Sequence, residues 1–286
     1  MVDVERRAVS VAGHRLSYLD AGPLDAPVVV LVHGLLSTSG TWGRVVEPLA
    51  AHGLRVIALD LVGHGESDKP RGSYLLDDFA LSLDRFFDAL NIGSATMCGH
   101  SLGGAIAVHF GYHFPKRVER LVLVSAGGLG REVNLVLRAL SMRGAERVTA
   151  AVMDRRPVQC LLRSPSVHRA MRVQPERLDN LRRIGRSLMR KDLRAAFFAS
   201  LRAVIEPSGQ RGSFVEMRYL AEQVPTLLVW SREDGIIPVA HAEATHALLP
   251  GSRLVIFDGG GHEPHHRNAV AFADEVASFI ASHSTG

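Results

Sequence analysis

The chain has 286 residues, 47% of them hydrophobic, and a formal net charge of +4. This length suits one α/β domain with an insertion, at the upper end of what one hydrophobic core supports. No apolar run is long enough to suggest a membrane-spanning helix, and the first residues lack the pattern of a secretory signal. With only two cysteines, the composition does not indicate a disulfide scaffold, and we expect a cytoplasmic location.

Buried strands and amphipathic helices alternate along the first part of the chain. Residues 27–32 form a continuous apolar run typical of a central strand, whereas residues 76–90 place their apolar side chains on one helical face. In chain order, the pattern predicts a hairpin of strands at 7–13 and 15–20, a strand at 27–32, a helix at 41–51, a strand at 54–60, a helix at 76–90, a strand at 95–98, a helix at 102–113 and a strand at 121–125.

The alternation then stops and later resumes. No buried strand is expected in the middle of the chain, where prolines separate four helical stretches, at residues 135–152, 175–189, 191–204 and 214–220. The alternation resumes with a strand at 225–230, a helix at 239–248, a strand at 253–257 and a helix at 270–280.

This order of elements predicts the α/β class, with a mostly parallel sheet covered by helices on both faces. We expect a core domain made of residues 1–126 and 219–286. Residues 127–218 would form an inserted helical cap, or lid, at the carboxyl edge of the sheet, where ligands bind in such folds.

Ser101 is the predicted nucleophile. It stands at the centre of Gly99-His100-Ser101-Leu102-Gly103, which matches the pattern G-x-S-x-G and lies between a predicted strand and a predicted helix. The glycines permit a sharp turn that exposes the serine hydroxyl above the sheet, and the following helix directs free N–H groups toward it. An ordinary glycine-rich turn is the alternative interpretation.

His262 and Asp234 are the predicted partners of the nucleophile. A serine hydroxyl needs a general base, and His262 follows three glycines between a strand and the last helix. The alternative bases are His241, His246, His265 and His266. Asp234 would orient the base, because Gly235 and Pro238 favour the tight turn that a buried carboxylate needs; Glu233 is its close rival.

Two backbone N–H groups are expected to form an oxyanion hole. One belongs to Leu102, directly after the nucleophile. The other should come from the loop after residues 27–32, where Gly34 lets the chain present the N–H of Leu35, with Leu36 as the next choice.

Five motifs together resemble the α/β-hydrolase superfamily, in particular its small capped members that are similar to lipases and esterases. They are His33-Gly34, residues 60–68, residues 99–104, residues 230–238 and Gly261-His262. The resemblance spans about residues 5–126 and 222–282 and implies an eight-stranded sheet and the chain order Ser101, Asp234, His262. It differs at Ser231, where relatives usually have glycine.

The resemblance implies a serine hydrolase of the carboxylesterase or lipase type. Relatives that are epoxide hydrolases or dehalogenases use an aspartate nucleophile, which Ser101 argues against. The alternatives on the same triad are a thioesterase or lactonase and a carbon–carbon bond hydrolase of the meta-cleavage type. Apolar cap residues with a nearby arginine would suit that last substrate. A ligand receptor with vestigial catalysis is a further alternative.

The predicted cap is strongly basic. Residues 131–218 carry 18 arginines and one lysine against eight acidic residues. Such a segment is either a solvated helical surface or a patch that attracts an anionic substrate or a membrane surface. We expect a small-molecule ester or lipid-like substrate, no nucleic-acid partner, no integral membrane contact, no cofactor and no metal, since no metal-ligand spacing was identified.

Overall fold

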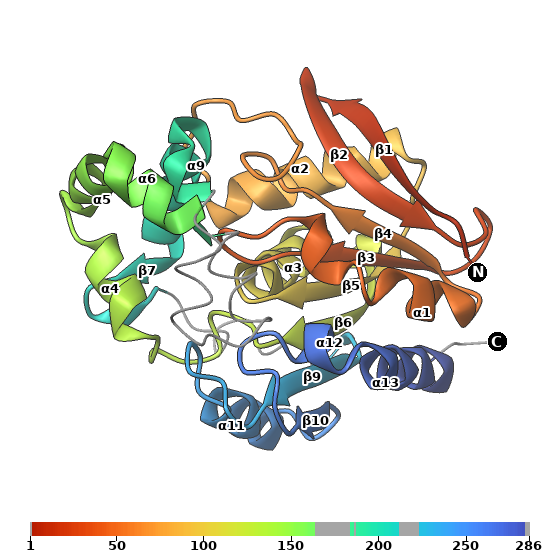
Figure 1. Cartoon of the computed structure of the whole chain (residues 1–286). Helices are drawn as coiled ribbons and strands as arrows, with labels where there is room; N and C mark the ends of the chain where they lie inside the picture. The colour runs from red at the N-terminus through yellow and green to blue at the C-terminus, as the bar shows by residue number, and fades with distance from the viewer. Residues whose placement is uncertain (1, 164–183, 186, 212–222, 284–286) are drawn as a thin grey trace.

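Eight strands form a single sheet in the order β1-β2-β4-β3-β5-β6-β9-β10 (Figure 1). The computed structural model describes residues 2–163, 184–185, 187–211 and 223–283. The strands are β1 (Val4–Val11), β2 (His14–Ala21), β3 (Val28–Val32), β4 (Arg55–Leu59), β5 (Ala95–His100), β6 (Val118–Val124), β9 (Thr226–Ser231) and β10 (Arg253–Phe257). Within this sheet β2 runs antiparallel to both of its neighbours, β1 and β4, and the other pairs are parallel, so the predicted mostly parallel eight-stranded sheet is confirmed.

Helices cover both faces of this sheet, as the alternation predicts. They are α1 (Val46–Ala51), α2 (Leu76–Ala89), α3 (Leu102–His113), α11 (Ala240–Leu248), α12 (Pro264–Arg267) and α13 (Ala269–Ser282). The helix expected at 41–51 is shorter, because a 3-10 turn at Ser39–Trp42 precedes α1. Thr38 begins that turn by accepting a hydrogen bond from the N–H of Gly40.

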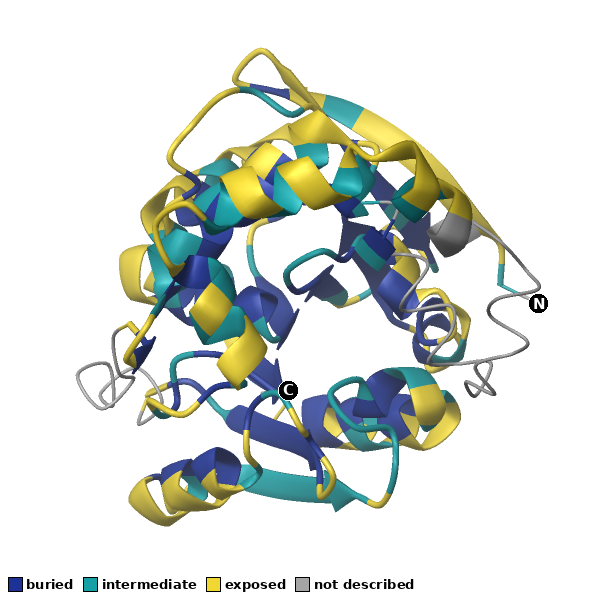
Figure 2. Cartoon of the chain, turned by 60° about the vertical axis from the view of Figure 1, so that its left-hand side comes forward, coloured by how far each residue is buried: buried dark blue, intermediate teal, exposed yellow. Residues whose placement is uncertain are grey.

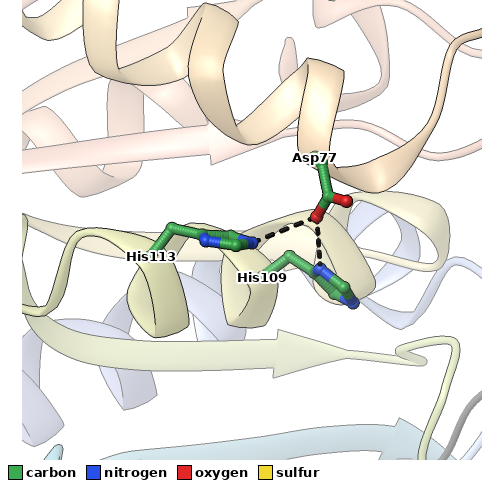
Figure 3. A group of neighbouring side chains, drawn as sticks. All are labelled: Asp77, His109 and His113. Atoms are coloured by element: carbon green, nitrogen blue, oxygen red, sulfur yellow. Dashed lines mark hydrogen bonds and ion pairs between the residues drawn. The ribbon is translucent and has the colours of Figure 1, made fainter.

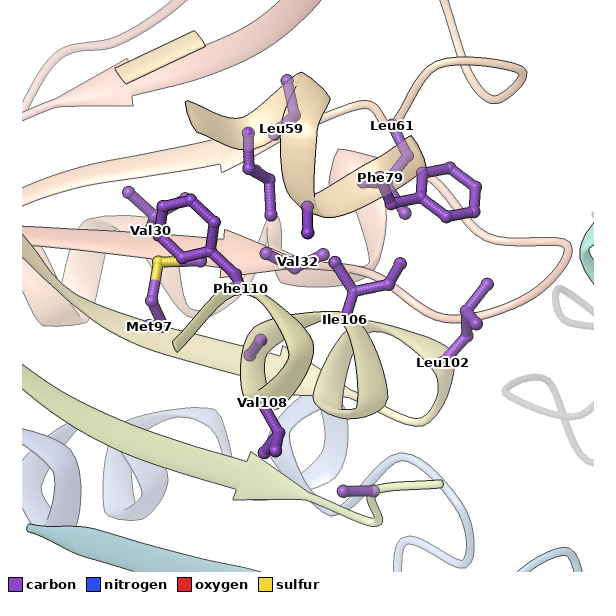
Figure 4. Packing of buried hydrophobic residues seen from close by; sticks show 14 of the residues in the cluster. Val30, Val32, Leu59, Leu61, Phe79, Met97, Leu102, Ile106, Val108 and Phe110 are labelled. Carbon is purple, nitrogen blue, oxygen red and sulfur yellow. The ribbon is translucent and has the colours of Figure 1, made fainter. Parts of the chain in front are cut away.

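Strand β3 separates two hydrophobic cores. Val30 and Val32 point to one face, where they pack with the apolar sides of α2 and α3 (Figure 4). Val29 and Leu31 point to the other face, against α1 and α13. All four side chains are fully buried, which explains why the strand has a continuous apolar sequence rather than an alternating one. Figure 2 shows the same layering: the central strands are buried, the edge strands are partly exposed, and the outer faces of the helices are exposed.

The chain between β6 and β9 is mainly helical where it is described. It contains α4 (Leu135–Ser141), α5 (Ala145–Met153), α6 (Arg156–Arg163) and α9 (Lys191–Val204), which Figure 1 groups at one side of the molecule. The helix predicted at 191–204 matches α9, whereas the one predicted at 135–152 is two helices, since Gly144 between them has a φ of 89°. A short hairpin of β7 (Ile205–Glu206) and β8 (Gly209–Gln210) was not predicted.

Two other predictions concern residues that the structure covers little or not at all. Most of the helix predicted at 175–189 and all of that at 214–220 lie outside the described residues. The boundaries 127–218 of the cap therefore stay a prediction. In the described part of the chain, no helix combines the length and the apolar character that crossing a membrane requires.

The loop after β4 is held by Asp60. Its carboxylate accepts hydrogen bonds from the N–H of Ser39 at 2.6 Å and of Glu66 at 2.9 Å. The hydroxyl of Ser67 donates to the carbonyl of Asp60. These bonds pair backbone N–H and carbonyl groups of the turns, so Asp60 and Ser67 have a structural role.

Candidate active site

Ser101 occupies a strained turn between β5 and α3. Its φ of 54° and ψ of −117° lie in a region that serine rarely adopts. The surrounding backbone holds this conformation: the N–H of Ser101 donates to the carbonyl of Val124 at 3.0 Å. The carbonyl of Ser101 accepts from the N–H groups of Gly104 and Gly127, each also at 3.0 Å. The turn therefore has the strained geometry that the G-x-S-x-G pattern predicts.

Close backbone contacts explain two glycines of this motif. A Cβ atom on Gly99 would lie 2.2 Å from the carbonyl oxygen of Gly103. A Cβ atom on Gly103 would lie 2.1 Å from the carbonyl oxygen of Val32, at the end of β3. Because backbone atoms block both positions, α3 can begin this close to β3 and β5 only with glycine there.

We expect Gly103→Ala to destabilise the protein by about 1–3 kcal/mol or more, since the added methyl group overpacks against a fixed strand. Urea unfolding followed by circular dichroism would measure the loss. Gly93→Ala is the matched control, because a Cβ atom there meets nothing within 4 Å. Equal stability of the two variants would contradict this account of the turn.

The structure places Asp234 against His262. The two carboxylate oxygens of Asp234 lie 2.9 and 3.1 Å from Nδ1 of His262. The Asp234 side chain is fully buried, and its Oδ1 also accepts from the N–H groups of Ile236 at 2.9 Å and Ile237 at 3.0 Å. Burial alone would raise the pKa of Asp234, but the hydrogen bond and charge of His262 and the two amides outweigh it and lower the pKa. Asp234 is therefore held as a carboxylate facing the histidine.

Glu233, the rival acid, has a different position. Its Oε2 accepts from the N–H of Gly259 at 2.7 Å and lies 2.9 Å from the hydroxyl of Ser231. The same hydroxyl lies 2.9 Å from the carbonyl of Gly259. Ser231, the departure from the family pattern, thus joins the loop after β9 to the glycine loop that carries His262.

The alternative histidines have other partners. His241 bonds to the carboxylate of Glu132 at 2.7 Å, and His246 bonds to the hydroxyl of Ser252 at 2.8 Å. His265 is fully buried beside Trp42, with ring centroids 4.3 Å apart. Of the five histidines considered, His262 is the one that the structure pairs with Asp234.

Two further histidines support the site, and the sequence analysis assigned them no role. Nε2–H of His100 donates to the carbonyl of His262 at 2.7 Å, which fixes the backbone of the predicted base. His33 accepts at Nε2 from the N–H of Leu61 and donates from Nδ1 to the carbonyl of Gly34 at 2.8 Å. Both histidines lie inside motifs of the sequence, but the bonds to Leu61 and to His262 join segments that are far apart along the chain.

Buried neutral histidines are expected to make the protein acid-labile. Burial, followed by the charge of neighbouring His262, lowers the pKa of His100 to about 4; burial and His33 lower the pKa of His64 to about 3. An unfolded histidine titrates near pH 6.5, so below that pH the unfolded chain binds more protons than the folded one.

The free energy of unfolding should therefore decrease as the pH falls from about 6.5 toward 4, by about 2 kcal/mol for each of the two histidines at pH 5. Urea unfolding between pH 8 and 5 would measure this slope. His64→Gln should reduce the dependence of the free energy of unfolding on pH. His14→Gln, which changes an exposed histidine, should leave this dependence unchanged. An unchanged slope in His64→Gln would contradict the assignment.

Ser101 lies where two cavities meet. Both cavities are lined by Leu35, Ser101, Leu137 and Ile236. One, of about 250 Å³, extends along α3 to Gln210 and Arg211. The other, of about 270 Å³, extends to Phe197, Glu263 and His262. Cleaving a bond between two substrate groups requires space for one group on each side of Ser101, and the two cavities offer it. The residues that line both cavities are mostly apolar.

The predicted oxyanion donors lie beside this cavity. Leu102 is the first residue of α3, and Leu35 follows Gly34 in the loop after β3. Among the described residues, the backbone N–H groups of Leu35 and Leu102 donate to no protein acceptor. Both donors are therefore available to a ligand, and their role stays a prediction.

Comparisons with known proteins agree with this architecture. The sequence model of a family described as "alpha/beta hydrolase fold" matches residues 27–269. An uncharacterised protein of Mycobacterium tuberculosis is 39% identical over 281 residues, which span 95% of this chain and 80% of that protein. A 2-hydroxy-6-oxononadienedioate/2-hydroxy-6-oxononatrienedioate hydrolase of Paraburkholderia xenovorans is 31% identical over 274 residues, covering 93% of this chain and 91% of that protein. The crystal structure of an esterase from Rhodococcus sp. matches with a TM-score of 0.71 and 27% identity, over 98% of this chain and 99% of the esterase.

Proposed function

The chain belongs to the α/β-hydrolase family, and from this premise we propose that it is a serine hydrolase that cleaves a carboxylic ester of a small or lipid-like molecule. The observation that carries the proposal is the pairing of Asp234 with His262 beside a cavity that Ser101 also lines. This is the arrangement that a base-activated serine needs, with the acid orienting the base.

In the proposed mechanism, His262 takes the proton of the Ser101 hydroxyl as the oxygen attacks the ester carbonyl. The N–H groups of Leu35 and Leu102 stabilise the negative charge that develops on the carbonyl oxygen. His262 then protonates the leaving alcohol, and an acyl-enzyme on Ser101 remains. Water, activated by the same histidine, releases the acid. Asp234 keeps the imidazole in the correct tautomer and stabilises its charged form.

A second candidate is the hydrolysis of a carbon–carbon bond in a substrate that carries a carboxylate. Its support is the relative of Paraburkholderia xenovorans named a dienedioate hydrolase, and Arg211 at the end of the cavity that runs along α3. The arginine could bind a substrate carboxylate, and Phe197 in the other cavity could contact an apolar group. A thioesterase or lactonase would use the same catalytic groups.

The proposal is tested in two steps. Reaction with a fluorophosphonate probe followed by peptide mass spectrometry should place one adduct on Ser101; absence of the adduct in folded protein would reject the serine mechanism and, if turnover is also absent, would favour a binding protein. Turnover of chromogenic esters, thioesters, lactones and ring-cleavage diketones should then be compared. We expect the ester to have the highest kcat/KM, and a preference for the diketone would establish the second candidate.

The remaining expectations belong to the same proposal. We retain a helical cap at residues 127–218 above the site, since Leu137 of α4 and Val204 of α9 line the cavity next to Ser101. We also retain a cytoplasmic location, supported by the free thiols of Cys98 and Cys160. The basic segment would contact an anionic substrate or, at most, the surface of a membrane.

A further inference from the structure

Three potential metal ligands come together at the contact between α2 and α3, apart from Asp234 and His262. Asp77 lies in the first turn of α2, and His109 and His113 lie one turn apart on α3 (Figure 3). Nδ1 of His109 lies 3.4 Å from Oδ1 of Asp77, and Nε2 of His113 lies 3.1 Å from the same oxygen. The three ligand atoms lie within 4.8 Å of one another.

These distances agree with the coordination of a small cation. Zn²⁺ binds imidazole nitrogen and carboxylate oxygen at about 2.0–2.1 Å, so neighbouring atoms of a tetrahedral shell lie about 3.3 Å apart. The two distances to Asp77, 3.4 and 3.1 Å, are close to that value. The third distance, between the two imidazole nitrogens, is at most 4.8 Å, and metal binding would bring them to coordination distance by side-chain rotation. We propose that Asp77, His109 and His113 bind a divalent transition metal of the Zn²⁺ class, leaving one position open for water.

The state of His109 gives independent support. Its Nδ1 is buried and meets no hydrogen-bond partner among the described residues; its contact with Asp77, at 3.4 Å, is an ion pair. A buried ring nitrogen without a hydrogen bond is a costly arrangement unless another group binds there. A metal between the two atoms would satisfy both.

The donor set also determines the class of metal. Two imidazoles and one carboxylate suit Zn²⁺, Co²⁺, Ni²⁺ or Cu²⁺, whereas Ca²⁺ and Mg²⁺ require more oxygen ligands. Each imidazole binds the metal through an unprotonated nitrogen, so protons compete with the metal and binding weakens at low pH.

The position of the site gives it a role in the fold. Because one ligand comes from α2 and two come from α3, the metal would join two helices that pack on the same face of the sheet. His109 also lines the cavity that contains Ser101, so the metal would stiffen one wall of that cavity without belonging to the proposed catalytic groups. This inference departs from the expectation of no metal, since the approach of Asp77 to the two histidines of α3 depends on the packing of α2 against α3.

The test uses untagged full-length protein, freed of metal with a chelator. Calorimetric titration with Zn²⁺ at pH 7.5 should give one site per chain, Co²⁺ should give the visible absorption of a tetrahedral complex, and Zn²⁺ should raise the Tm. His113→Ala and Asp77→Ala should each weaken Zn²⁺ binding at least about 100-fold, since even the loss of an outer-shell partner costs 10–100-fold. Both positions are exposed, so the variants should fold.

His52→Ala is the matched control. His52 is also an exposed histidine paired with an aspartate, Asp274, at 3.0 Å, but it has no second histidine one turn away. This variant should bind Zn²⁺ as the unmodified protein does. The proposal is overturned if the unmodified protein lacks a stoichiometric site, or if His113→Ala keeps the affinity and the tetrahedral Co²⁺ spectrum.

Discussion

Replacing Ser101 by alanine is expected to lower kcat for a chromogenic ester by about a millionfold, the size of effect seen when a serine nucleophile is removed elsewhere. The substitution removes the atom that would form the acyl-enzyme, while the turn and the cavity remain. Residual turnover would come from water attack assisted by the oxyanion donors and by substrate binding. Single-turnover kinetics with purified variant protein would measure it.

The loss must be separated from misfolding and from contaminating esterase. A circular dichroism spectrum like that of the unmodified protein should accompany the loss. His262→Ala should have an effect of similar size, and the double variant should be no slower than either single variant, because the two groups act as one unit. Additive losses would indicate independent roles, and full activity in Ser101→Ala would reject the nucleophile.

Asp234→Asn is expected to lower kcat by about 10⁴-fold. Asparagine has nearly the same shape, but its NH₂ group can donate where the carboxylate only accepted, so His262 would be held in the wrong tautomer and its charged form would lose its partner. The N–H groups of Ile236 and Ile237 would still hold the loop through the remaining carbonyl oxygen. The substrate KM should therefore change little.

Glu233→Gln is the matched control, since it makes the same change one residue earlier. Glu233 bonds to the Gly259 amide rather than to His262, so its kcat should stay within a few-fold of the unmodified enzyme. If Glu233→Gln were as inactive as Asp234→Asn, the functional acid would not be the one that the structure pairs with His262.

The sequence predicted most accurately those structural features that depend on a short stretch of the chain. The strand–helix alternation, the helix over 191–204 and the turn at Ser101 follow from periodicity and glycine spacing within short windows. The division of the helix predicted at 135–152 was missed, because an isolated glycine such as Gly144 can stand either inside a helix or between two.

Contacts between distant residues were beyond the reach of the sequence. The choice of Asp234 over Glu233 could be argued from turn residues, but only the fold shows that Ser231 and Glu233 bind the glycine loop. In the same way, the support of His262 by His100 spans 162 positions. The spacing of two histidines on α3 is visible in the sequence, whereas their approach to Asp77 depends on how α2 packs.

The positive φ of Ser101 has a consequence for protein engineering. Glycine at position 101 would relieve backbone strain of about 1–3 kcal/mol. The residue that would stabilise the folded protein most at this position therefore has no hydroxyl. Because Ser101 is the proposed nucleophile, a directed-evolution experiment that rewarded only heat resistance is expected to select a stable protein without turnover. A thermostabilisation campaign therefore needs a parallel screen for turnover, because at the proposed nucleophile a gain in stability is expected to cost activity.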